Sequence, residues 1–424
     1  MEMTKYKLGD LCRIASSKRI FESEYVDQGI PFIRGQEISD GSILDPKASF
    51  ECYISQDRYE EIKEKYGKPS KGDILITAVG TIGNLCYLDK DIDFYFKDGN
   101  VIWFSEIIPS CEGKFLFHFM KSSFFKNQLK YFMIGAVQKA LTIDMLKKVD
   151  VPLPPLPEQK KIASVLSALD DKIALNKKMN QKLEAMAKRL YDYWFVQYDF
   201  PDKNGHPYKT TGGPMTYNPT LKREIPVGWE VKTLDEYLDC NKYSLTAKSS
   251  YDFIQYLDTS SLTENTLESL QKYGSQAESP SRAKRIVYAN DILYSTVRPQ
   301  QKHYGIIKNP AQNMIASTGF AILSCKYGSE YNDMFYLFLI QEKNLIKLSA
   351  IADSNASSYP SFNPSDLLNL SICLPKDIKT IEPLVKKFSS LFGIIERNQK
   401  ENQKLTALRD KLLPLLMNGQ VVVE

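Results

Sequence analysis

One helical sequence motif occurs twice in this chain, and this repetition limits the folds that the chain can adopt. "NKKMNQKLEA" begins at Asn176 and "NQKENQKLTA" begins at Asn398, and both read Asn-x-x-x-Asn-Gln-Lys-Leu-x-Ala. The strand-like run Gly72–Gly83 is echoed in the same way by Asn290–Gln301. Self-similarity over such a distance marks a duplicated structural unit. The chain is therefore predicted to be an internal pseudo-two-fold repeat, in which each copy has a globular part followed by a helix.

Both helices carry apolar residues at alternating spacings of three and four, which is the pattern of a coiled-coil seam. The seam runs from Ile162 to Trp194 in the first copy and from Leu384 to Leu416 in the second. Polar residues in a seam weaken the pairing but fix its register. The predicted register positions are Asn176, Asn180, Asn398 and Asn402. We expect the two helices to pair as an antiparallel coiled coil; the alternative is that each helix packs only on its own globular part.

The length of these helices indicates what kind of ligand the molecule suits. A helix of roughly 35 residues is about 50 Å long at about 1.5 Å per residue. Two paired helices of that length would hold two related heads at a fixed distance. Such a two-headed arrangement suits a long, repetitive ligand with a two-part site, and DNA is the obvious candidate.

The globular parts read as mixed α/β heads. Short apolar runs bounded by Gly, Asp and Lys predict strands early in each copy, and helical spacing predicts one helix over 113–132 and one over 332–350. The stretch Asp199–Glu230 is rich in Pro, Gly, Thr and Asn, and predicts a long linker. The fold class is α/β (α+β) heads in tandem, separated by two long helices. The predicted boundaries are 1–157 for the first head, 158–198 for the first helical spacer, 199–228 for the linker, 229–378 for the second head and 379–424 for the second helical spacer.

Composition indicates the cellular compartment of the protein but does not identify its ligand. The net charge of +4 permits nucleic-acid binding but does not indicate it, so a basic patch would have to be local. The seven cysteines are scattered, with no Cys-x-x-Cys pair, which favours a reducing cytoplasm over a zinc site or a disulfide framework. No apolar run is long enough to cross a membrane, and the first residues are not a signal peptide. We therefore expect a cytoplasmic protein without a membrane partner.

A search for catalytic patterns finds none that we favour. The three histidines are far apart in the sequence, and neither of the glycine-rich phosphate-binding motifs is present. "AVGTIG" within Gly72–Gly83 is interpreted as a tight turn. Glu61 and Lys63 match half of a nuclease carboxylate–lysine motif, but a solvated helix face is the favoured interpretation. The sequence thus predicts no catalytic residues, no metal ligands and no cofactor held by this chain.

Several segments in order resemble the specificity (S) subunit of Type I restriction–modification systems. They are "GDILIT…GTIG", "VPLPPLPEQKKIA" before the first helix, "NQKLEAMAKRLYDYWF", and "REIPVGWE" before the second copy. The similarity extends over essentially the whole chain. It departs in the second copy, where "CLPKDIKTIEPLV" stands in place of "PLPPLPEQKKIASVL", so the start of the second helix is uncertain from the sequence.

The resemblance implies a non-catalytic subunit whose heads are target-recognition domains. Each head would read one half of a bipartite, asymmetric site in double-stranded DNA. The helices would dock two methyltransferase (M) subunits, which bind S-adenosylmethionine, and restriction (R) motor-nuclease subunits would join through them. If both heads read one face of B-DNA about 10 bp apart, and each reads about 3 to 4 bp, the unread spacer is about 6–7 bp. The apolar runs Leu190–Phe195 and Leu413–Val423 are predicted to lie on the outer face as docking patches.

Candidate DNA contacts are polar and basic residues on loops between the short strands. Arg and Gln make bidentate contacts to bases, whereas Lys and Thr more often hold phosphate. In the first head the candidates are Lys18, Arg19, Arg34, Gln36, Thr77, Thr81, Gln138 and Lys139. In the second head they are Thr259, Ser295, Arg298, Gln300, Gln301, Lys302, Ser357 and Tyr359. Because the two sets differ in chemistry, the two half-sites should differ.

Two other classes of protein remain open on the residues alone. One is a two-headed coiled-coil scaffold that binds only proteins, which the small net charge favours slightly. The other is a nuclease or methyltransferase with unrecognised motifs. Selective binding to duplex DNA would exclude the first, and activity of the isolated chain would support the second.

Overall fold

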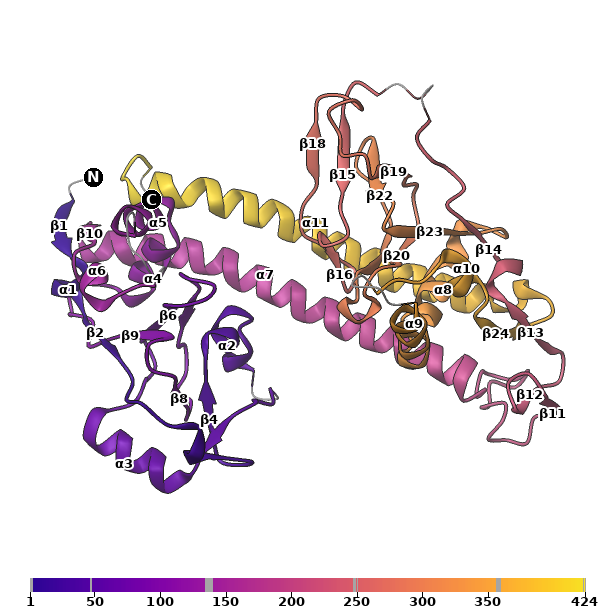
Figure 1. Cartoon of the computed structure of the whole chain (residues 1–424), viewed down its shortest axis with the longest axis horizontal. Coiled ribbons are helices and arrows are strands. Elements are labelled where there is room, and N and C mark those ends of the chain that lie inside the picture. The colour runs from indigo at the N-terminus through magenta and orange to yellow at the C-terminus, as the bar shows by residue number, and fades with distance from the viewer. Residues whose placement is uncertain are drawn as a thin grey trace. The chain divides into compact units, whose positions relative to one another are not determined.

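The computed structural model describes residues 3–45, 48–133, 140–246, 249, 251–355, 360–421 and 423. The chain divides into two compact units (Figure 1). Unit 1 consists of Met1–Ala174 and Asn402–Glu424, and unit 2 consists of Leu175–Glu401. Each unit therefore contains a head together with part of both long helices.

Unit 1 contains a mixed head that precedes the first long helix. Its elements are β1 (Thr4–Lys7), α1 (Leu8–Leu11), β2 (Arg13–Ser16), β3 (Tyr25–Val26), β4 (Ile30–Ile33), α2 (Gly35–Ser39), β5 (Tyr53–Ile54), α3 (Gln56–Tyr66), β6 (Ile74–Thr77), β7 (Leu85–Tyr87), β8 (Tyr95–Phe96), β9 (Val101–Ser105), α4 (Gly113–Lys121), α5 (Ser123–Phe132), α6 (Ile143–Lys147) and β10 (Asp150–Leu153). One antiparallel sheet has the order β2-β9-β6-β7, and a second has the order β3-β5-β4-β8, in which β4 and β8 are parallel. Every residue of β6 and β9 is buried, as expected for central strands covered on both faces.

Unit 2 repeats this architecture with different loops. Its elements are β11 (Met215–Asn218), β12 (Arg223–Pro226), β13 (Trp229–Thr233), β14 (Leu238–Cys240), β15 (Ile254–Leu257), β16 (Leu262–Thr263), β17 (Thr266–Leu267), β18 (Gln271–Tyr273), β19 (Ala283–Ile286), β20 (Asp291–Ser295), β21 (Tyr304–Ile307), β22 (Met314–Ser317), β23 (Phe320–Cys325), α8 (Asn332–Leu339), α9 (Glu342–Ser354), α10 (Pro364–Leu368) and β24 (Ser371–Pro375). The sheet β14-β23-β20-β21 matches β2-β9-β6-β7, and the parallel pair β15 and β22 matches β4 and β8. The predicted tandem α/β heads are confirmed.

Two predicted helices are each broken into a pair. The segment 113–132 forms α4 and α5, and the segment 332–350 forms α8 and most of α9. Ser122 separates α4 from α5 because it takes an extended conformation, with φ of −67° and ψ of 156°, and caps α5 by accepting from the Phe125 N–H at 3.3 Å. Serine is a favoured residue at the N-cap of a helix. The spacing of the apolar residues alone did not show whether Ser122 caps a new helix or lies inside one long helix.

The predicted linker is folded. Its residues form the hairpin of β11 and β12, and its aromatic side chains pack against the start of β13. The Phe200 ring stacks on Trp229 with centroids 4.9 Å apart and on Tyr208 at 4.6 Å. Pro, Gly and Thr residues in this linker therefore shape turns between ordered contacts.

The long helices are α7 (Leu156–Tyr191) and α11 (Glu382–Met417). A single π-helical turn, Asp192–Val196, follows α7. A short 3-10 turn, Ile378–Ile381, precedes α11, which accounts for the altered sequence before the second helix.

Hydrogen bonds show that α7 and α11 pair antiparallel within each unit. In unit 1 Asn402 donates to the Ile173 carbonyl at 3.4 Å, and Arg409 donates to Asp170 at 2.8 Å. In unit 2 Asn176 donates to Glu401 at 2.7 Å, and Asn398 donates to Asn180 at 2.8 Å. In each unit, the residue with the higher number on α7 bonds to the residue with the lower number on α11. The predicted antiparallel coiled coil is confirmed.

The remaining pair of asparagines also meets across the helices. In unit 2 the Asn398 side chain donates to Asn180 Oδ1 at 2.8 Å, and Asn180 donates to the Ile395 carbonyl at 3.3 Å. Asn176 is almost fully buried in the seam, so its amide would be costly to leave unpaired in another register. This geometry fits the predicted role of the four asparagines in fixing register.

Several side chains of the apolar runs predicted to lie outward are instead part of the core. Tyr191 and Phe195 are buried in unit 2, and Leu416 and Met417 are buried in unit 1, in each case against the head of that unit. The prediction failed because a seam pattern does not tell on which side of a helix pair the head packs.

A partly buried polar cluster joins α4 to both long helices in unit 1. His118 Nε2 lies 3.1 Å from Ser167 Oγ, and Asp170 accepts from Lys121 Nζ and from Arg409 Nη1, each at 2.8 Å. Burial, followed by the charge of Lys121, lowers the pKa of His118 to about 4. Burial acts to raise the pKa of Asp170, but hydrogen bonds from Lys121 and Arg409 hold it below its usual value. The folded unit therefore holds a neutral histidine beside an ionised aspartate.

The lowered pKa of His118 predicts a loss of stability in mild acid. The unfolded chain binds a proton at this residue near the ordinary histidine pKa of 6.5, whereas the folded chain does so only near pH 4. As pH falls from about 6.5 towards 4, the free energy of unfolding should therefore drop by up to about 1.4 kcal/mol per unit, and level off below 4. The contribution of Asp170 is lost separately, below its unfolded pKa.

The measurement is the urea midpoint between pH 7 and 5. In His118→Gln this midpoint should depend less on pH than in the wild type. His206→Gln changes an exposed histidine and serves as the matched control, with the wild-type dependence retained. Equal pH dependence in His118→Gln and the wild type would contradict the assignment.

Candidate nucleic-acid interface

In unit 1 the loops that follow several strands meet at one edge of the sheets. β4 and β8 are parallel, so both end at this edge, where the Lys97 N–H donates to the Ile33 carbonyl at 2.9 Å. The Ala78 N–H after β6 donates to the Asn100 carbonyl at 2.7 Å. We call this the first recognition edge; its loops are residues 17–19, 34–36, 78–84 and 97–100.

Four predicted contacts lie exposed on the first recognition edge: Lys18, Arg19, Gln36 and Thr81. The Lys18 ammonium lies 4.5 Å from the centroid of the Tyr66 ring. Arg19 Nε lies 3.3 Å from the carboxylate of Asp98, on loop 97–100. The structure thus brings these side chains, which are distant in sequence, to one edge.

Arg34 is also on this edge, but its guanidinium is engaged. It forms an ion pair with Glu51 and lies 3.8 Å from Glu37. The hydrogen bond to Glu51 raises the pKa of Arg34. An arginine held in this way is pre-oriented, and its remaining donors point from a fixed position at the start of α2.

Two predicted contacts, Thr77 and Ser295, are buried and serve the fold. Thr77 Oγ1 donates to the Thr81 carbonyl at 2.5 Å, and it accepts from the Asn84 N–H at 3.0 Å. Ser295 Oγ donates to the Val297 carbonyl at 3.0 Å. Both hydroxyls close the turn after a central strand, and neither side chain is exposed on its unit. The sequence selected both residues because they lie at the end of a predicted strand. The sequence pattern does not show whether the last residue of a strand is buried.

Unit 2 has a matching edge. β15 and β22 are parallel and end together, and the Thr296 N–H donates to the Gly319 carbonyl at 2.9 Å. Thr259 packs against Gly319 so closely that a Cβ there would lie 2.8 Å from the Thr259 methyl. We call this the second recognition edge; its loops are residues 258–261, 296–302, 317–319 and 360–362.

The turn "TVRPQQK" on the second recognition edge is held in a strained conformation. Arg298 has φ of 44° and Lys302 has φ of 56°, both in the left-handed region that side chains other than glycine disfavour. Such positions cost about 1–3 kcal/mol each and cluster at functional sites. The Arg298 N–H donates to the Pro360 carbonyl at 3.0 Å, which fixes the turn against loop 360–362.

The predicted residues of this turn are all exposed, and the side chains of Gln300 and Lys302 lie close to acidic residues of the unit. Gln300 Nε2 lies 3.4 Å from Asp353, and Lys302 Nζ lies 2.7 Å from Glu264. Gln301 and Arg298 are exposed beside them. The turn therefore gathers a guanidinium, two amides and an ammonium at one place on the surface of unit 2.

Four predicted contacts lie outside the described residues: Gln138, Lys139, Ser357 and Tyr359. The structure adds candidates that the sequence search missed, Lys97 and Asn100 on the first edge and Arg282 and Thr318 beside the second. The Thr318 N–H donates to the Arg282 carbonyl at 2.9 Å. "KDGN" at 97–100 is a turn signal between strand-like runs and would have identified the first pair.

Glu61 and Lys63 lie on the solvated side of α3, as the favoured interpretation of the sequence expects. Glu61 pairs with Lys65 and Lys63 pairs with Glu60, each at 2.8 Å. Within the described part of the chain, no group of three or more His, Cys, Asp or Glu residues is arranged to hold a metal ion. No helix in that part is long and apolar enough to cross a membrane.

Comparison with known proteins places the repeat in a family. The Type I restriction modification DNA specificity domain matches residues 1–185 and again residues 226–407. The MjaIX specificity subunit of Methanocaldococcus jannaschii is 26% identical over 95% of this chain and 89% of its own length. The HindI specificity subunit of Haemophilus influenzae is 22% identical over 98% of this chain and 99% of its own.

A solved structure supports the fold. The S subunit of a Type I restriction-modification system from M. genitalium superimposes with a TM-score of 0.58 at 16% identity, covering 98% of this chain and 96% of the other. The repeat is accounted for by two family domains in tandem. Each unit has a recognition edge and contains segments of both antiparallel helices. The chain belongs to the family of Type I restriction–modification DNA specificity proteins and is a specificity subunit.

Proposed function

We propose that each head of this specificity subunit reads one half of a bipartite, asymmetric DNA site. The observation that carries the proposal is the duplication of the recognition edge. Each unit gathers loops from the ends of a parallel strand pair, β4 and β8 or β15 and β22, at one place. The two edges differ in side chains, since one presents Lys18, Arg19 and Gln36 and the other presents Arg298 and Gln301.

The proposed partners are double-stranded DNA, two methyltransferase subunits and, through them, restriction subunits. This chain supplies recognition, and S-adenosylmethionine is bound by the methyltransferase subunits. Methyl transfer to DNA then requires the partner chains, and the purified single chain is inert with S-adenosylmethionine. The edges, which carry amide, guanidinium and ammonium groups, are suited to base and phosphate contacts.

Single-head substitutions should change one half-site and leave the other intact. Gln36→Ala removes an amide from the first edge and should relax one base position, with a loss of about 1–3 kcal/mol of discrimination. Arg298→Ala should do the same for the other half. The measurement is genome-wide methylation mapping in cells that carry the partner subunits and each variant.

The matched control is Gln56→Ala, which removes an exposed glutamine of α3 away from the edge. It should leave the methylated sequence unchanged. If methylation were identical with and without this chain, a scaffold that binds only proteins would be favoured. If Gln36→Ala altered both halves equally, the assignment of one head to one half would be wrong.

We further propose that the helix pair sets the unread spacer, at about 6–7 bp. In an antiparallel pair, a test by insertion must use positions on the two helices that lie opposite each other. The opposed positions are 174/175 on α7 and 401/402 on α11. There Ile173 keeps its bond to Asn402, and Asn176 keeps its bond to Glu401.

Inserting one heptad at both opposed positions should lengthen the preferred spacer. Seven residues add about 10 Å at about 1.5 Å each, which is near 3 bp at about 3.4 Å per base step. The insertion also rotates the heads about the duplex, so the expected result in methylation mapping is a longer spacer or lost methylation. Both half-site sequences should be unaltered. An unchanged spacer with changed half-sites would contradict the ruler proposal, and a heptad inserted in α7 alone is the mismatched control.

An exposed apolar stripe on α7 supports the docking of a methyltransferase subunit on the helix pair. Leu175, Met179 and Met186 are 54%, 41% and 50% exposed, and they follow one helix face within unit 2. Methionine-rich exposed surfaces are adaptable binding sites. This stripe replaces the outward patches expected from the sequence.

Substituting the stripe should weaken methyltransferase docking. Leu175→Glu/Met179→Glu should reduce the number of methyltransferase chains per specificity subunit below the two expected for the wild type. Native mass measurement of the complex under saturating partner gives the stoichiometry. Lys178→Glu, an exposed change of charge on the same helix, is the control and should keep two. A 1:1 wild-type complex would contradict the proposal of two docking sites.

A further inference from the structure

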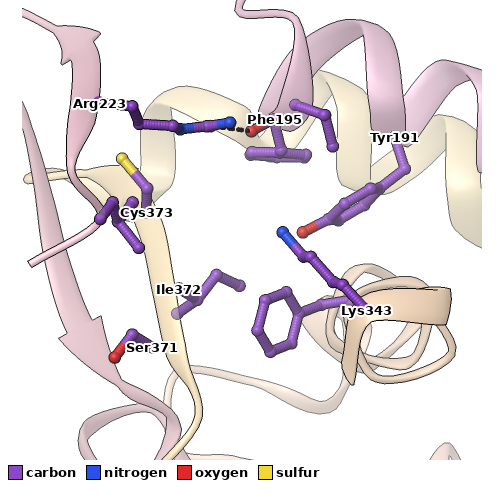
Figure 2. Close-up of a pocket in the computed structure, with 10 residues that line it drawn as sticks. Tyr191, Phe195, Arg223, Lys343, Ser371, Ile372 and Cys373 are labelled. Carbon is purple, nitrogen blue, oxygen red and sulfur yellow. Dashed lines mark hydrogen bonds between the residues drawn. The ribbon is translucent and has the colours of Figure 1, made fainter. Parts of the chain in front are cut away.

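A cavity of about 170 Å³ lies in unit 2 where the end of α7 meets α9 (Figure 2). Its polar lining comes from four separate segments. Tyr191 lies at the end of α7, Arg223 begins β12, Lys343 is in the first turn of α9, and Ser371 and Cys373 are in β24. The cavity is several times larger than the roughly 30 Å³ that one water occupies in the liquid. A small polyatomic ligand therefore fits it.

Two cations face this cavity, and no carboxylate is among its lining residues. Figure 2 shows the Lys343 ammonium and the Tyr191 hydroxyl pointing toward one another into the space. Lys343 belongs to the exposed side of α9, yet burial of its ammonium, followed by the charge of Arg223, lowers its pKa. Asp192 acts in the opposite direction, but its carboxylate accepts from Gln341 Nε2 at 3.2 Å and does not line the cavity.

Arg223 has donors to spare. Its Nη2 donates to the Phe195 carbonyl at 3.4 Å, and its guanidinium lies 4.5 Å from the centroid of the Tyr198 ring and also interacts with the Tyr198 hydroxyl. Its Nε is buried and has no hydrogen-bond partner within the described part of the chain. A buried guanidinium donor left unpaired is costly unless a ligand satisfies it.

The corresponding cavity of unit 1 provides an internal comparison. It measures about 440 Å³ and lies where the end of α11 meets α4 and α5. Lys121, Lys126 and Arg409 line it, but so does Asp410. Asp170 pairs with both Lys121 and Arg409 at 2.8 Å. In unit 1 carboxylates pair directly with the lining cations, whereas in unit 2 no carboxylate lines the cavity.

We propose that the unit 2 cavity is a binding site for one small oxyanion of the phosphate class, held between Arg223 and Lys343. The arginine fork and the ammonium are the donors that recognise such an ion. The hydroxyls of Tyr191 and Ser371 complete the set. The bound anion joins α7, β12, α9 and β24, and it thereby stabilises unit 2 at the point where its long helix ends.

The test is the thermal midpoint of the full chain in inorganic phosphate, compared with chloride at equal ionic strength. At a hundredfold excess over Kd, phosphate should raise the wild-type midpoint by about 5 to 10 °C. Lys343→Met should weaken phosphate binding by about 10- to 100-fold. Lys347→Met, an exposed lysine on the same helix, is the matched control and should respond as the wild type does.

A second variant protects the test against a folding defect. Arg223→Lys keeps the charge but not the planar fork, so it should fold and bind phosphate more weakly. The proposal is overturned if phosphate and chloride give the same wild-type midpoint, or if Lys343→Met keeps the full phosphate response.

Binding to duplex DNA without terminal phosphates identifies the source of the anion. If the cavity holds a backbone phosphate, Lys343→Met should lower duplex affinity and reduce the salt slope by about 1. If it holds free phosphate, duplex affinity should not change. This site lies apart from the second recognition edge in sequence and lining, so its failure would leave the half-site proposal intact.

Discussion

Antiparallel pairing of α7 and α11 is the interaction on which each unit depends. Unit 1 has no complete core without the end of the chain, because Leu413, Leu416 and Met417 are buried among residues of the first head. Unit 2 uses the start of α11 in the same way, with Phe388, Phe392 and Ile395 in its core. Both heads therefore form their cores with segments of both helices. A change in the register of the helices would disturb head packing as well as the seam.

Polar groups inside this apolar seam make the register specific. Apolar side chains tolerate a shift by one heptad, since the spacing repeats, but a buried amide must find its partner again. Asn176 with Glu401 and Asn180 with Asn398 are such partners in unit 2. A buried ion pair adds to this in the same unit, where Lys308 Nζ lies 2.5 Å from Asp333 and Ser389 of α11 donates to the same carboxylate at 2.9 Å. The second head is thus tied to α11 by a hydrogen bond to a buried carboxylate as well as by packing.

The two heads show how one backbone supports two binding chemistries. Thr77 and Ser295 occupy the same place in the repeat, and both use their hydroxyls to close a turn. The parallel strand pair is kept, and so is the gathering of loops at its end. The exposed loop residues differ, as do the charges at the two cavities. Duplication preserved what the fold requires, and the side chains with no structural duty diverged.

The sequence by itself determined the repeat, the paired long helices, the α/β heads and the family, because these rest on periodicity and on motifs within short stretches. It also placed candidate contacts in segments that do meet at an edge, such as Lys18 on a loop and Gln36 in the first turn of α2. Tertiary structure alone decided burial and neighbours. Thr77 and Ser295 are buried, and so are Tyr191 and Phe195. The predicted linker packs against Trp229. Tertiary structure also brought Arg223 and Lys343 to one cavity. The physical reason is that spacing along a chain fixes which side chains share a helix or strand face, whereas the side to which that face turns depends on contacts between residues far apart in the sequence.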